Sequence, residues 1–182
     1  SGSKLTTSGP RWPAMESEPG AAYGFLFKEG ERILGGLQKP PAVDEECDKK
    51  LAILMGEIET SLGRGFDAVI TCDGGYCRRH LLLTRATIVA FADGRIHSLG
   101  GSLAPQDGFT NYETEMAARN EGLAYAAEHG ARFVAVIFDA TSPVLAAKKF
   151  RCSGARNQTR AVSDIMLASS VDAENRLEEI VN

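Results

Sequence analysis

The stretch VITCDGGYC, residues 69–77, joins a hydrophobic run to an aspartate that two glycines follow. The apolar residues predict a strand from Phe66 to Thr71 that leads into Asp73. Asp-Gly is a strong turn dipeptide, so one interpretation is that Asp73 only opens a turn. The other is that the end of the strand holds the Asp73 carboxylate in a fixed position for chemistry. The second interpretation requires other acids of the fold to lie close to Asp73, whereas the first does not.

Composition limits the class of protein before any motif is considered. The 182 residues predict a single domain with a substantial core, and a hydrophobic content of 43 % excludes wholesale disorder. The formal net charge of −4 argues against a globally basic nucleic-acid-binding protein. No apolar run approaches the roughly 20 residues that span a bilayer, so no membrane partner is expected. The four cysteines, Cys47, Cys72, Cys77 and Cys152, lack zinc-type spacing, which favours a reduced, intracellular compartment without distinguishing cytoplasm from nucleus.

The first 65 residues are expected to lie outside the main domain. Residues 1–20 are polar and rich in Ser, Gly and Pro, and we interpret them as a flexible leader or an expression-tag remnant. Two short apolar runs within residues 21–38 predict a β-hairpin. A helix is expected from Asp44 to about Gly63, which completes an extension over residues 21–65. Its apolar stripe is expected to lie in the core and consists of Leu51, Leu54, Met55, Ile58 and Leu62.

Residues 66–182 are expected to form the main α/β domain. Within it, residues 81–92 and 95–103 alternate in a way that predicts two strands. The short Asp93-Gly94 connection between them is typical of an antiparallel hairpin.

Acids occur where the remaining elements of this domain begin or end. Asn111 is expected to cap a helix that runs to about His129 and carries Glu115 near its start, and the apolar strand that follows it ends at Asp139. If the strands leading to Asp73 and Asp139 are parallel neighbours, their carboxylates converge at one edge of the sheet. Each acid also has a structural interpretation, as a turn residue, a solvated helix residue or a helix cap.

The order of these elements resembles the ribonuclease H family. That family has a strand with Asp-Gly, a hairpin, a helix carrying a glutamate, and a strand ending in a second aspartate. TNYETEMAA, residues 110–118, is similar to the family's helix-start motif, a Thr-Asn pair followed by an acid and then small or apolar residues. The resemblance covers about residues 66–150. It implies a ribonuclease H-like α/β fold, a mixed sheet with flanking helices, to which the N-terminal hairpin and helix are added.

The same resemblance implies a metal site. By position, Asp73, Glu115 and Asp139 match the catalytic carboxylates. Their hard oxygen ligands suit Mg²⁺ or Mn²⁺, and in the family reaction two such ions about 3.5–4 Å apart clamp the scissile phosphate. The ending DAENRLEEIVN is similar to the family's final helix, which implies Glu179 as a further ligand, although the segment also fits a plain amphipathic helix.

A nucleic-acid partner is expected from the placement of cations. KKFRCSGARNQTR, residues 148–160, contains no acid and follows the third carboxylate, where the family often places hybrid-binding side chains. The expected phosphate contacts are Lys148, Lys149, Arg151, Arg156 and Arg160, with Arg78 and Arg79 beside the site. The alternative is a solvated basic loop.

The function expected from these features is a metal-dependent endonuclease that hydrolyses the RNA strand of RNA–DNA hybrids. Family members usually carry a fifth strand and a mobile loop histidine after the third acid. Here 43 residues follow Asp139, and none of the three histidines lies among them. This departure leaves open a second function, a catalytically silent module for protein assembly or nucleic-acid binding. The N-terminal extension would then contact a protein partner or a second copy of the chain.

Overall fold

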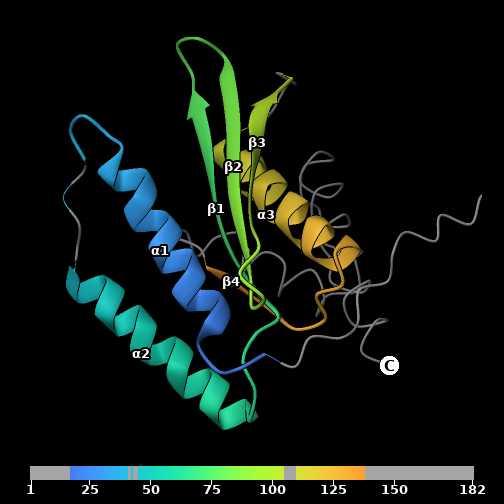
Figure 1. The fold of residues 1–182 in the computed structure, drawn as a ribbon. Coiled ribbons are helices and arrows are strands. Elements are labelled where there is room, and N and C mark those ends of the chain that lie inside the picture. The colour runs from blue at the N-terminus through green and yellow to red at the C-terminus, as the bar shows by residue number, and fades with distance from the viewer. Residues whose placement is uncertain (1–16, 41, 43–44, 105–109, 138–182) are drawn as a thin grey trace, which may run out of the picture.

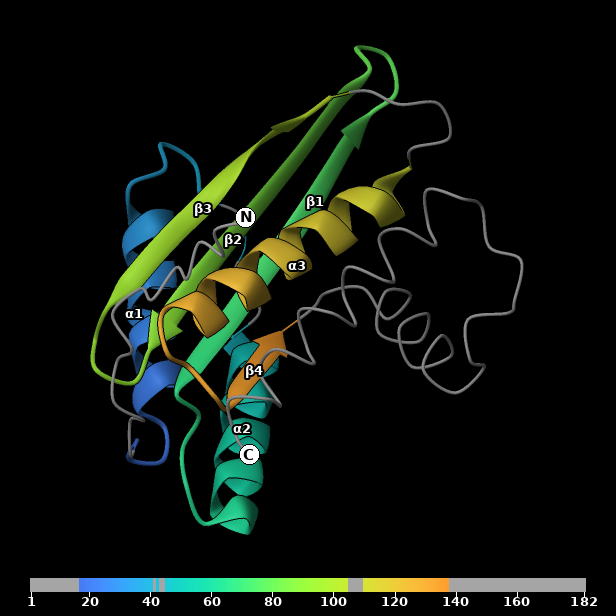
Figure 2. The same ribbon diagram turned by 90° about the vertical axis from the view of Figure 1, so that its right-hand side faces the viewer.

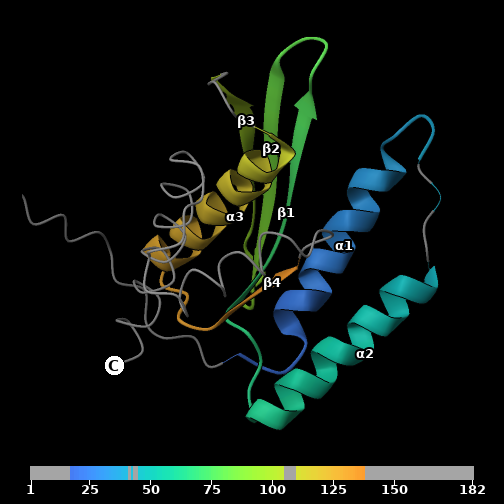
Figure 3. The same ribbon diagram turned by 180° about the vertical axis from the view of Figure 1, so that it is seen from behind.

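The computed structural model describes residues 17–40, 42, 45–104 and 110–137 (Figure 1). A four-stranded sheet with the order β3-β2-β1-β4 forms the centre. Helix α3 (Asn111–Glu128) packs on one face of the sheet and α1 (Ala21–Gly35) on the other (Figure 2). Helix α2 (Glu45–Leu62) runs alongside α1, farther from β2 and β3 (Figure 3).

The central strand is β1 (Ala68–Cys77), because it pairs along both of its edges. On one edge it pairs antiparallel with β2 (Leu82–Phe91), which pairs antiparallel with β3 (Ile96–Leu103). On the other edge it runs parallel to β4 (Val134–Ile137). The predicted hairpin is therefore confirmed, and the two strands predicted to be parallel neighbours are neighbours in one sheet.

The predicted end of the first strand is wrong. β1 continues through Asp73, which pairs with Ala86, as far as Cys77. The turn comes only at residues 78–81. The hydrogen-bond ladder to β2 holds the Asp-Gly-Gly segment extended, so its turn propensity is overridden by pairing. Asp73 is thus neither a turn residue nor the tip of a strand.

Two apolar clusters lie on opposite faces of the sheet. Under α3, the cluster includes Ile70, Phe91 and Leu123. Under α1, it includes Leu26 and Val69. Successive residues of β1 contribute to opposite clusters, as the pleat of a strand covered on both faces requires. Both faces of β1 are therefore fixed by packing.

The predicted N-terminal hairpin is also wrong, because residues 21–35 form helix α1. Ala22 and Leu26, four residues apart, are buried against β1 and β2, which is helical spacing. The two apolar runs were interpreted as strands because Gly30 separates them. Inside the helix Gly30 faces open space, so it does not interrupt the packed side. Burial of one helical face against the sheet outweighs the modest cost of a helical glycine.

Helix α2 agrees with its prediction in extent but not in burial. Met55 is buried and Leu51 half-buried, whereas Leu54, Ile58 and Leu62 are 51 %, 37 % and 51 % exposed. The face turned toward the rest of the protein is centred on Met55 and the acidic Glu59 instead. The predicted apolar stripe is therefore only partly in the core, and the rest of it is surface.

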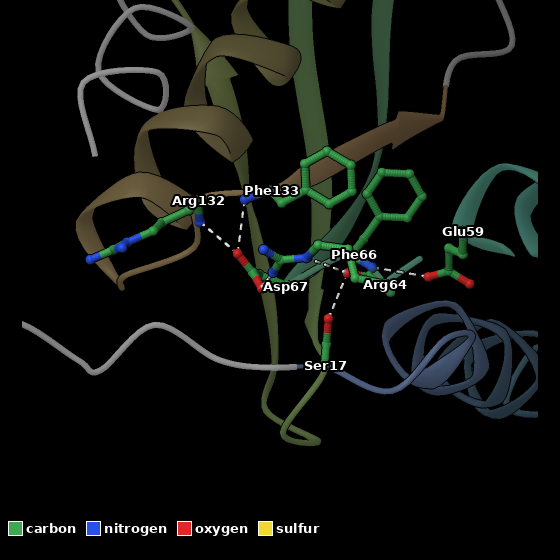
Figure 4. Close-up of polar contacts among 8 residues, drawn as sticks. Ser17, Glu59, Arg64, Phe66, Asp67, Arg132 and Phe133 are labelled. Carbon is green, nitrogen blue, oxygen red and sulfur yellow. Dashed lines mark hydrogen bonds and ion pairs between the residues drawn. The ribbon is translucent and has the colours of Figure 1, made fainter. Parts of the chain in front are cut away.

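Residues 17–20, assigned to a leader by composition, take part in the fold. The Ser17 hydroxyl donates to the Gly65 carbonyl oxygen at 2.6 Å, and the Gly65 amide donates back to the Ser17 carbonyl oxygen at 3.2 Å (Figure 4). Next to them, the fully buried Glu59 carboxylate accepts from the Gly20 amide at 2.6 Å and from the Phe66 amide at 3.0 Å. Because Gly20 is the N-cap of α1, Glu59 also places a negative charge at the positive end of that helix.

A second buried acid, Asp67, joins the start of β1 to the start of β4 (Figure 4). Its Oδ2 accepts from the Arg132 and Phe133 amides at 2.9 and 2.8 Å, and its Oδ1 pairs with the Arg64 guanidinium at 2.5 Å. Its own amide donates to the Phe133 carbonyl oxygen at 2.8 Å. Neither Asp67 nor Glu59 could be recognised from the sequence, since both acids lie among ordinary polar and apolar neighbours.

Among the described residues, Cys47, Cys72 and Cys77 form no disulfide. No helix within those residues is long and apolar enough to cross a membrane.

The Asp67→Asn variant tests the importance of this carboxylate. It keeps the shape of the side chain but removes the charge that Arg64 and two backbone amides share. We expect the free energy of unfolding to fall by about 2–4 kcal/mol, measured by urea denaturation. Asp93→Asn is the control, because Asp93 is an exposed turn residue whose ion pair with Arg95 lies at the surface, and its loss should stay below about 1 kcal/mol. Equal losses in the two variants would contradict this account.

Candidate functional site

Asp73 lies in the second half of β1 with its side chain exposed. Alternation along the strand places it on the same face as Val69, which packs under α1. Its neighbours Val69 and Cys72 are buried, so the backbone that carries the carboxylate is rigid. The strand thus presents one acid to solvent from a fixed position.

Gly74, the next residue, is covered by the start of α3. A Cβ built at Gly74 would collide with the Glu115 amide nitrogen and with the Thr114 side chain. Only glycine therefore permits the helix to approach β1 this closely. This contact brings the backbone of Glu115 against the residue that follows Asp73.

The first turn of α3 holds Glu115 in place. Thr110 is the N-cap and forms a capping box with Glu113, whose Oε2 accepts from the Thr110 amide at 2.6 Å and from its hydroxyl at 2.5 Å. The predicted Asn111 cap is therefore displaced by one residue. Asn111 instead donates from Nδ2 to Glu115 Oε1 at 3.1 Å. Glu115 is 4 % exposed, so the interpretation of it as a solvated helix acid is wrong.

The tyrosine between these residues belongs to the same turn. The Tyr112 hydroxyl is buried and has no hydrogen-bond partner among the described residues. Burial raises the pKa of Tyr112, and the charge of the neighbouring Glu113 raises it further. Tyr112 therefore stays neutral at ordinary pH.

The parallel pairing of β1 with β4 has a constant offset. Ala68 pairs with Val134 and Thr71 with Ile137, so each residue of β1 is opposite the residue 66 positions later. β4 is described up to Ile137, two residues before Asp139. Asp139 itself lies outside the described residues, as do Glu179 and the predicted cations Lys148, Lys149, Arg151, Arg156 and Arg160.

Arg78 and Arg79 lie in the turn between β1 and β2, and both are exposed. This turn reaches beyond the end of β3 (Figure 1). Asp73 and the two arginines are on the same strand and its turn, so a rigid ladder fixes their separation. Arg78 and Arg79 therefore lie beyond the end of β1 and not next to Asp73.

Two charged groups on or beside α3 were not predicted from the sequence. Arg85 of β2, opposite Gly74, donates from Nε and Nη2 to both oxygens of Glu121 at 3.0 Å each. Arg119, one turn after Glu115, is only 7 % exposed. Neither pairing nor burial of an arginine is visible in the sequence, although the spacing of Glu115 and Arg119 by four residues is a signal for side chains on one helix face.

The donor chemistry fits a hard divalent cation. Asp73 and Glu115 offer carboxylate oxygens, the ligand type that hard divalent cations prefer. Within residues 17–40, 42, 45–104 and 110–137, no three His, Cys, Asp or Glu residues form a group that could hold a metal ion. Of the three predicted ligands, Asp73 and Glu115 lie on elements whose backbones meet at Gly74, and Asp139 lies outside the described residues.

The topology defines a ribonuclease H-like α/β fold. It combines the order β3-β2-β1-β4, an antiparallel β1-β2-β3 ribbon, a parallel β4 and a helix that connects β3 to β4. The fold class expected from the sequence is confirmed, except that its N-terminal extension is two helices rather than a hairpin and a helix. Asp73 of β1 and Glu115 of α3, two of the residues predicted to act in catalysis, lie on elements whose backbones meet at Gly74.

Known proteins were compared with the chain. No protein-family model matches it, and no curated protein matches it. Among similar solved structures, the N-terminal ribonuclease H domain of a Mycobacterium tuberculosis protein, fused to maltose-binding protein, is 19 % identical with a TM-score of 0.49, over 62 % of this chain and 76 % of that one. Ribonuclease H1 from the archaeon Halobacterium salinarum is 17 % identical with a TM-score of 0.47, over 60 % of this chain and 77 % of that one. The ribonuclease H domain of prototype foamy virus is 16 % identical with a TM-score of 0.45, over 61 % and 75 %. Likeness at these identities concerns the fold alone, and the topology described above defines the class without it.

The contact between Gly74 and α3 can be tested by adding one methyl group. Gly74→Ala forces a Cβ against the Glu115 amide and the Thr114 hydroxyl. We expect the free energy of unfolding to fall by about 1–3 kcal/mol, because backbone must move to make room. Gly24→Ala is the control in denaturant titrations, since Gly24 is a helical glycine with open space around it and alanine should stabilise there by about 0.5–1 kcal/mol. A neutral Gly74→Ala would show that the helix start does not rest on β1.

Proposed function

We propose that this chain is a metal-dependent nuclease that hydrolyses the RNA strand of RNA–DNA hybrids, with Asp73, Glu115 and Asp139 as its metal-binding carboxylates. The observation that supports the proposal most is the register between β1 and β4. Its offset of 66 is also the separation of Asp73 and Asp139 in the sequence. If the pairing is continued by two residues past Ile137, Asp139 becomes the direct partner of Asp73.

The faces of the strands support the meeting of Asp73 with Asp139. Ala135 and Ile137 of β4 belong to the cluster under α1, as does Val69 of β1. Continued alternation would place Asp139 on the face to which Asp73 belongs. Glu115 approaches from the opposite face, across the glycine that follows Asp73.

These carboxylates would hold Mg²⁺ or Mn²⁺. A bound divalent cation would supply Lewis-acid activation for hydrolysis of a phosphodiester, in which water attacks phosphorus and the 3′-oxygen leaves. The protein contributes the fixed positions of its acids. Asp73 is held by its pairing with Ala86 of β2, and Glu115 by the Asn111 amide. Glu179 is the candidate for a further ligand.

Binding of nucleic acid would rely on cations at both ends of the site. Arg78 is five residues from Asp73, so the exposed arginine pair lies about 17 Å along the strand from the carboxylate at the usual rise per residue. That separation suits contacts to phosphates several nucleotides from the scissile bond. The basic segment 148–160 would contact the backbone on the side of Asp139.

A cleavage assay tests the activity. A labelled RNA–DNA hybrid is incubated with the protein and Mg²⁺ or Mn²⁺, beside DNA and RNA duplexes of the same sequence. We expect cleavage of the RNA strand of the hybrid alone, and losses of at least about 100-fold for Asp73→Asn and Asp139→Asn, because each removes a direct ligand rather than a supporting group.

Asp93→Asn is the matched control, because it removes a carboxylate from the other end of the sheet. Its rate should equal that of the wild type. Activity that persists in Asp73→Asn and Asp139→Asn would place the site elsewhere, and cleavage of all three duplexes would remove the hybrid as the specific substrate. Glu179→Gln in the same assay decides whether a fourth carboxylate takes part.

The second candidate function is a catalytically silent module for assembly, and the exposed part of α2 favours it. Leu54, Ile58 and Leu62 are four residues apart and form an exposed apolar row on α2, next to the exposed Ile53. Such a row is typical of a helix that packs against another helix. A second copy of this chain is the simplest occupant, since it would bury the same row on both partners.

Sedimentation velocity tests this assembly. If α2 mediates a dimer, the double variant Leu54→Glu, Ile58→Glu should sediment as a monomer at concentrations where the wild type is dimeric, because charges would enter an apolar interface. Leu81→Glu is the control, since Leu81 is 60 % exposed on the distant β1–β2 turn. A wild-type protein that remains monomeric at high concentration would eliminate this assembly.

A further inference from the structure

The turn between β1 and β2 presents two leucines to solvent. Leu81 and Leu82 are 60 % and 49 % exposed, whereas the next residue, Leu83, is 1 % exposed. We call residues 78–82 the hairpin tip, and it reaches beyond the end of β3 (Figure 1). Burial therefore stops at Leu83, and the leucines of the hairpin tip lie outside the core.

Leu81 also has a backbone conformation that leucine rarely adopts. Its φ is 48°, and among the residues that the structure describes it is the one non-glycine residue with a positive φ. In this left-handed region the Cβ crowds the following carbonyl oxygen, so glycine or asparagine would occupy the position at lower cost. Strained residues of this kind gather at binding and active sites. Stability alone favours a different residue at position 81, so the leucine side chain requires a reason outside the fold.

The hairpin tip is held by the ladder below it and carries two cations. Cys77 pairs with Leu82 as the last rung between β1 and β2, and the His80 amide donates to the Cys77 carbonyl oxygen at 3.2 Å. Arg78 and Arg79 are exposed on the same turn. Guanidiniums beside exposed leucines suit a partner that offers anionic groups next to an apolar interior. A nucleic-acid duplex does so, because its phosphates border grooves whose floor is the edge of the base stack.

We propose that Leu81 is an apolar wedge that enters the minor groove of a bound duplex and opens a base step, while Arg78 and Arg79 contact the flanking phosphates. The inference rests on the proposed function, in which the same strand carries Asp73. Leucine is one of the side chains that unstack base steps in this way, and the resulting kink lets more of the duplex contact the protein. Arg78 is about 17 Å from Asp73 along β1, so the opened step lies within about five base pairs of the scissile phosphate.

An anionic lipid surface would also attract arginines and leucines. Binding to such a surface scales with the apolar area that is buried, and interfacial segments are normally whole amphipathic helices. The hairpin tip offers only Leu81 and Leu82. Its place on the strand that carries Asp73 further favours the duplex over the lipid.

Unstacking can be measured in a chelator, so that no cleavage interferes. A short RNA–DNA hybrid carries the fluorescent base 2-aminopurine at successive positions of its DNA strand, and its emission rises when the base leaves the stack. Fluorescence anisotropy of a labelled hybrid gives the affinity. Leu81→Asn is the main variant, because asparagine suits the left-handed backbone and the protein should be at least as stable as the wild type. Leu81→Met retains an apolar wedge, and Leu37→Asn is the matched control, since Leu37 is a leucine just after α1 that is 48 % exposed.

We expect the wild type to raise the emission of at least one 2-aminopurine position. Leu81→Asn should lose this rise and bind the hybrid about tenfold more weakly, because a leucine side chain no longer leaves water on binding. Leu81→Met should retain the rise, and Leu37→Asn should match the wild type. The double variant Arg78→Gln, Arg79→Gln should reduce the slope of log affinity against log salt by about two, one for each lost phosphate contact.

Emission and affinity that are unchanged in Leu81→Asn would overturn the proposal. So would a Leu81→Asn protein that binds the hybrid normally but no longer binds vesicles of phosphatidylcholine and phosphatidylserine, since the leucine would then serve a lipid surface. Failure of the proposed function has a different signature. A protein that unstacks the hybrid in chelator but cleaves nothing in Mg²⁺ or Mn²⁺ retains the wedge and is not a nuclease.

Discussion

The arrangement of the candidate site depends on the buried carboxylate of Asp67. Asp67 accepts from the amides of Arg132 and Phe133 and donates its own amide to the Phe133 carbonyl oxygen. These bonds join residue 67 to residue 133 and so set the offset of 66 before the ladder from Ala68 to Thr71 begins. A parallel pair this short has few hydrogen bonds of its own, and one slipped residue would move every side chain of β4 to the other face. Asp67 thus fixes the register on which any meeting of Asp73 and Asp139 relies.

The same region also ties the N-terminal helices to the sheet. Phe66 stacks on Phe133 with ring centroids 4.8 Å apart, and its amide donates to Glu59 of α2. Glu59 in turn accepts from the amide that caps α1. The start of β1 therefore connects α1, α2 and β4 through two buried acids, each satisfied by backbone donors, which removes much of the cost of burying them. The extension is part of the same cooperative structure rather than an appended segment.

The sequence predicted the elements whose signals are local. The hairpin around Asp93-Gly94 has a turn that its dipeptide specifies, and α3 has a start motif and a glycine at its end. Where tertiary contacts decide the local structure, the secondary structure predicted from the sequence was wrong. Residues 21–35 became helical because Ala22 and Leu26 pack on the sheet, and Asp73 stayed in a strand because β2 pairs with it. For the site, Asp73 and Glu115 were predicted from the sequence. The close approach of the Glu115 backbone to Gly74 and the burial of Arg119 were not, since both depend on contacts between distant segments.

Gly74 shows how closely the fold and the proposed chemistry are linked. A side chain at this position would push α3 away from β1 and with it the amide of Glu115. Farther along the same helix, Gly122 allows an equally close approach to Ile70 and Thr87, and the Thr87 hydroxyl donates to the Ala118 carbonyl oxygen at 2.8 Å. The helix is thus seated by two glycines on different elements, one at each end of the segment that carries Glu115 and Arg119. Charged side chains can be held inside this contact because the backbones on both sides are already fixed, so the position of the acid is determined by packing before any cation arrives.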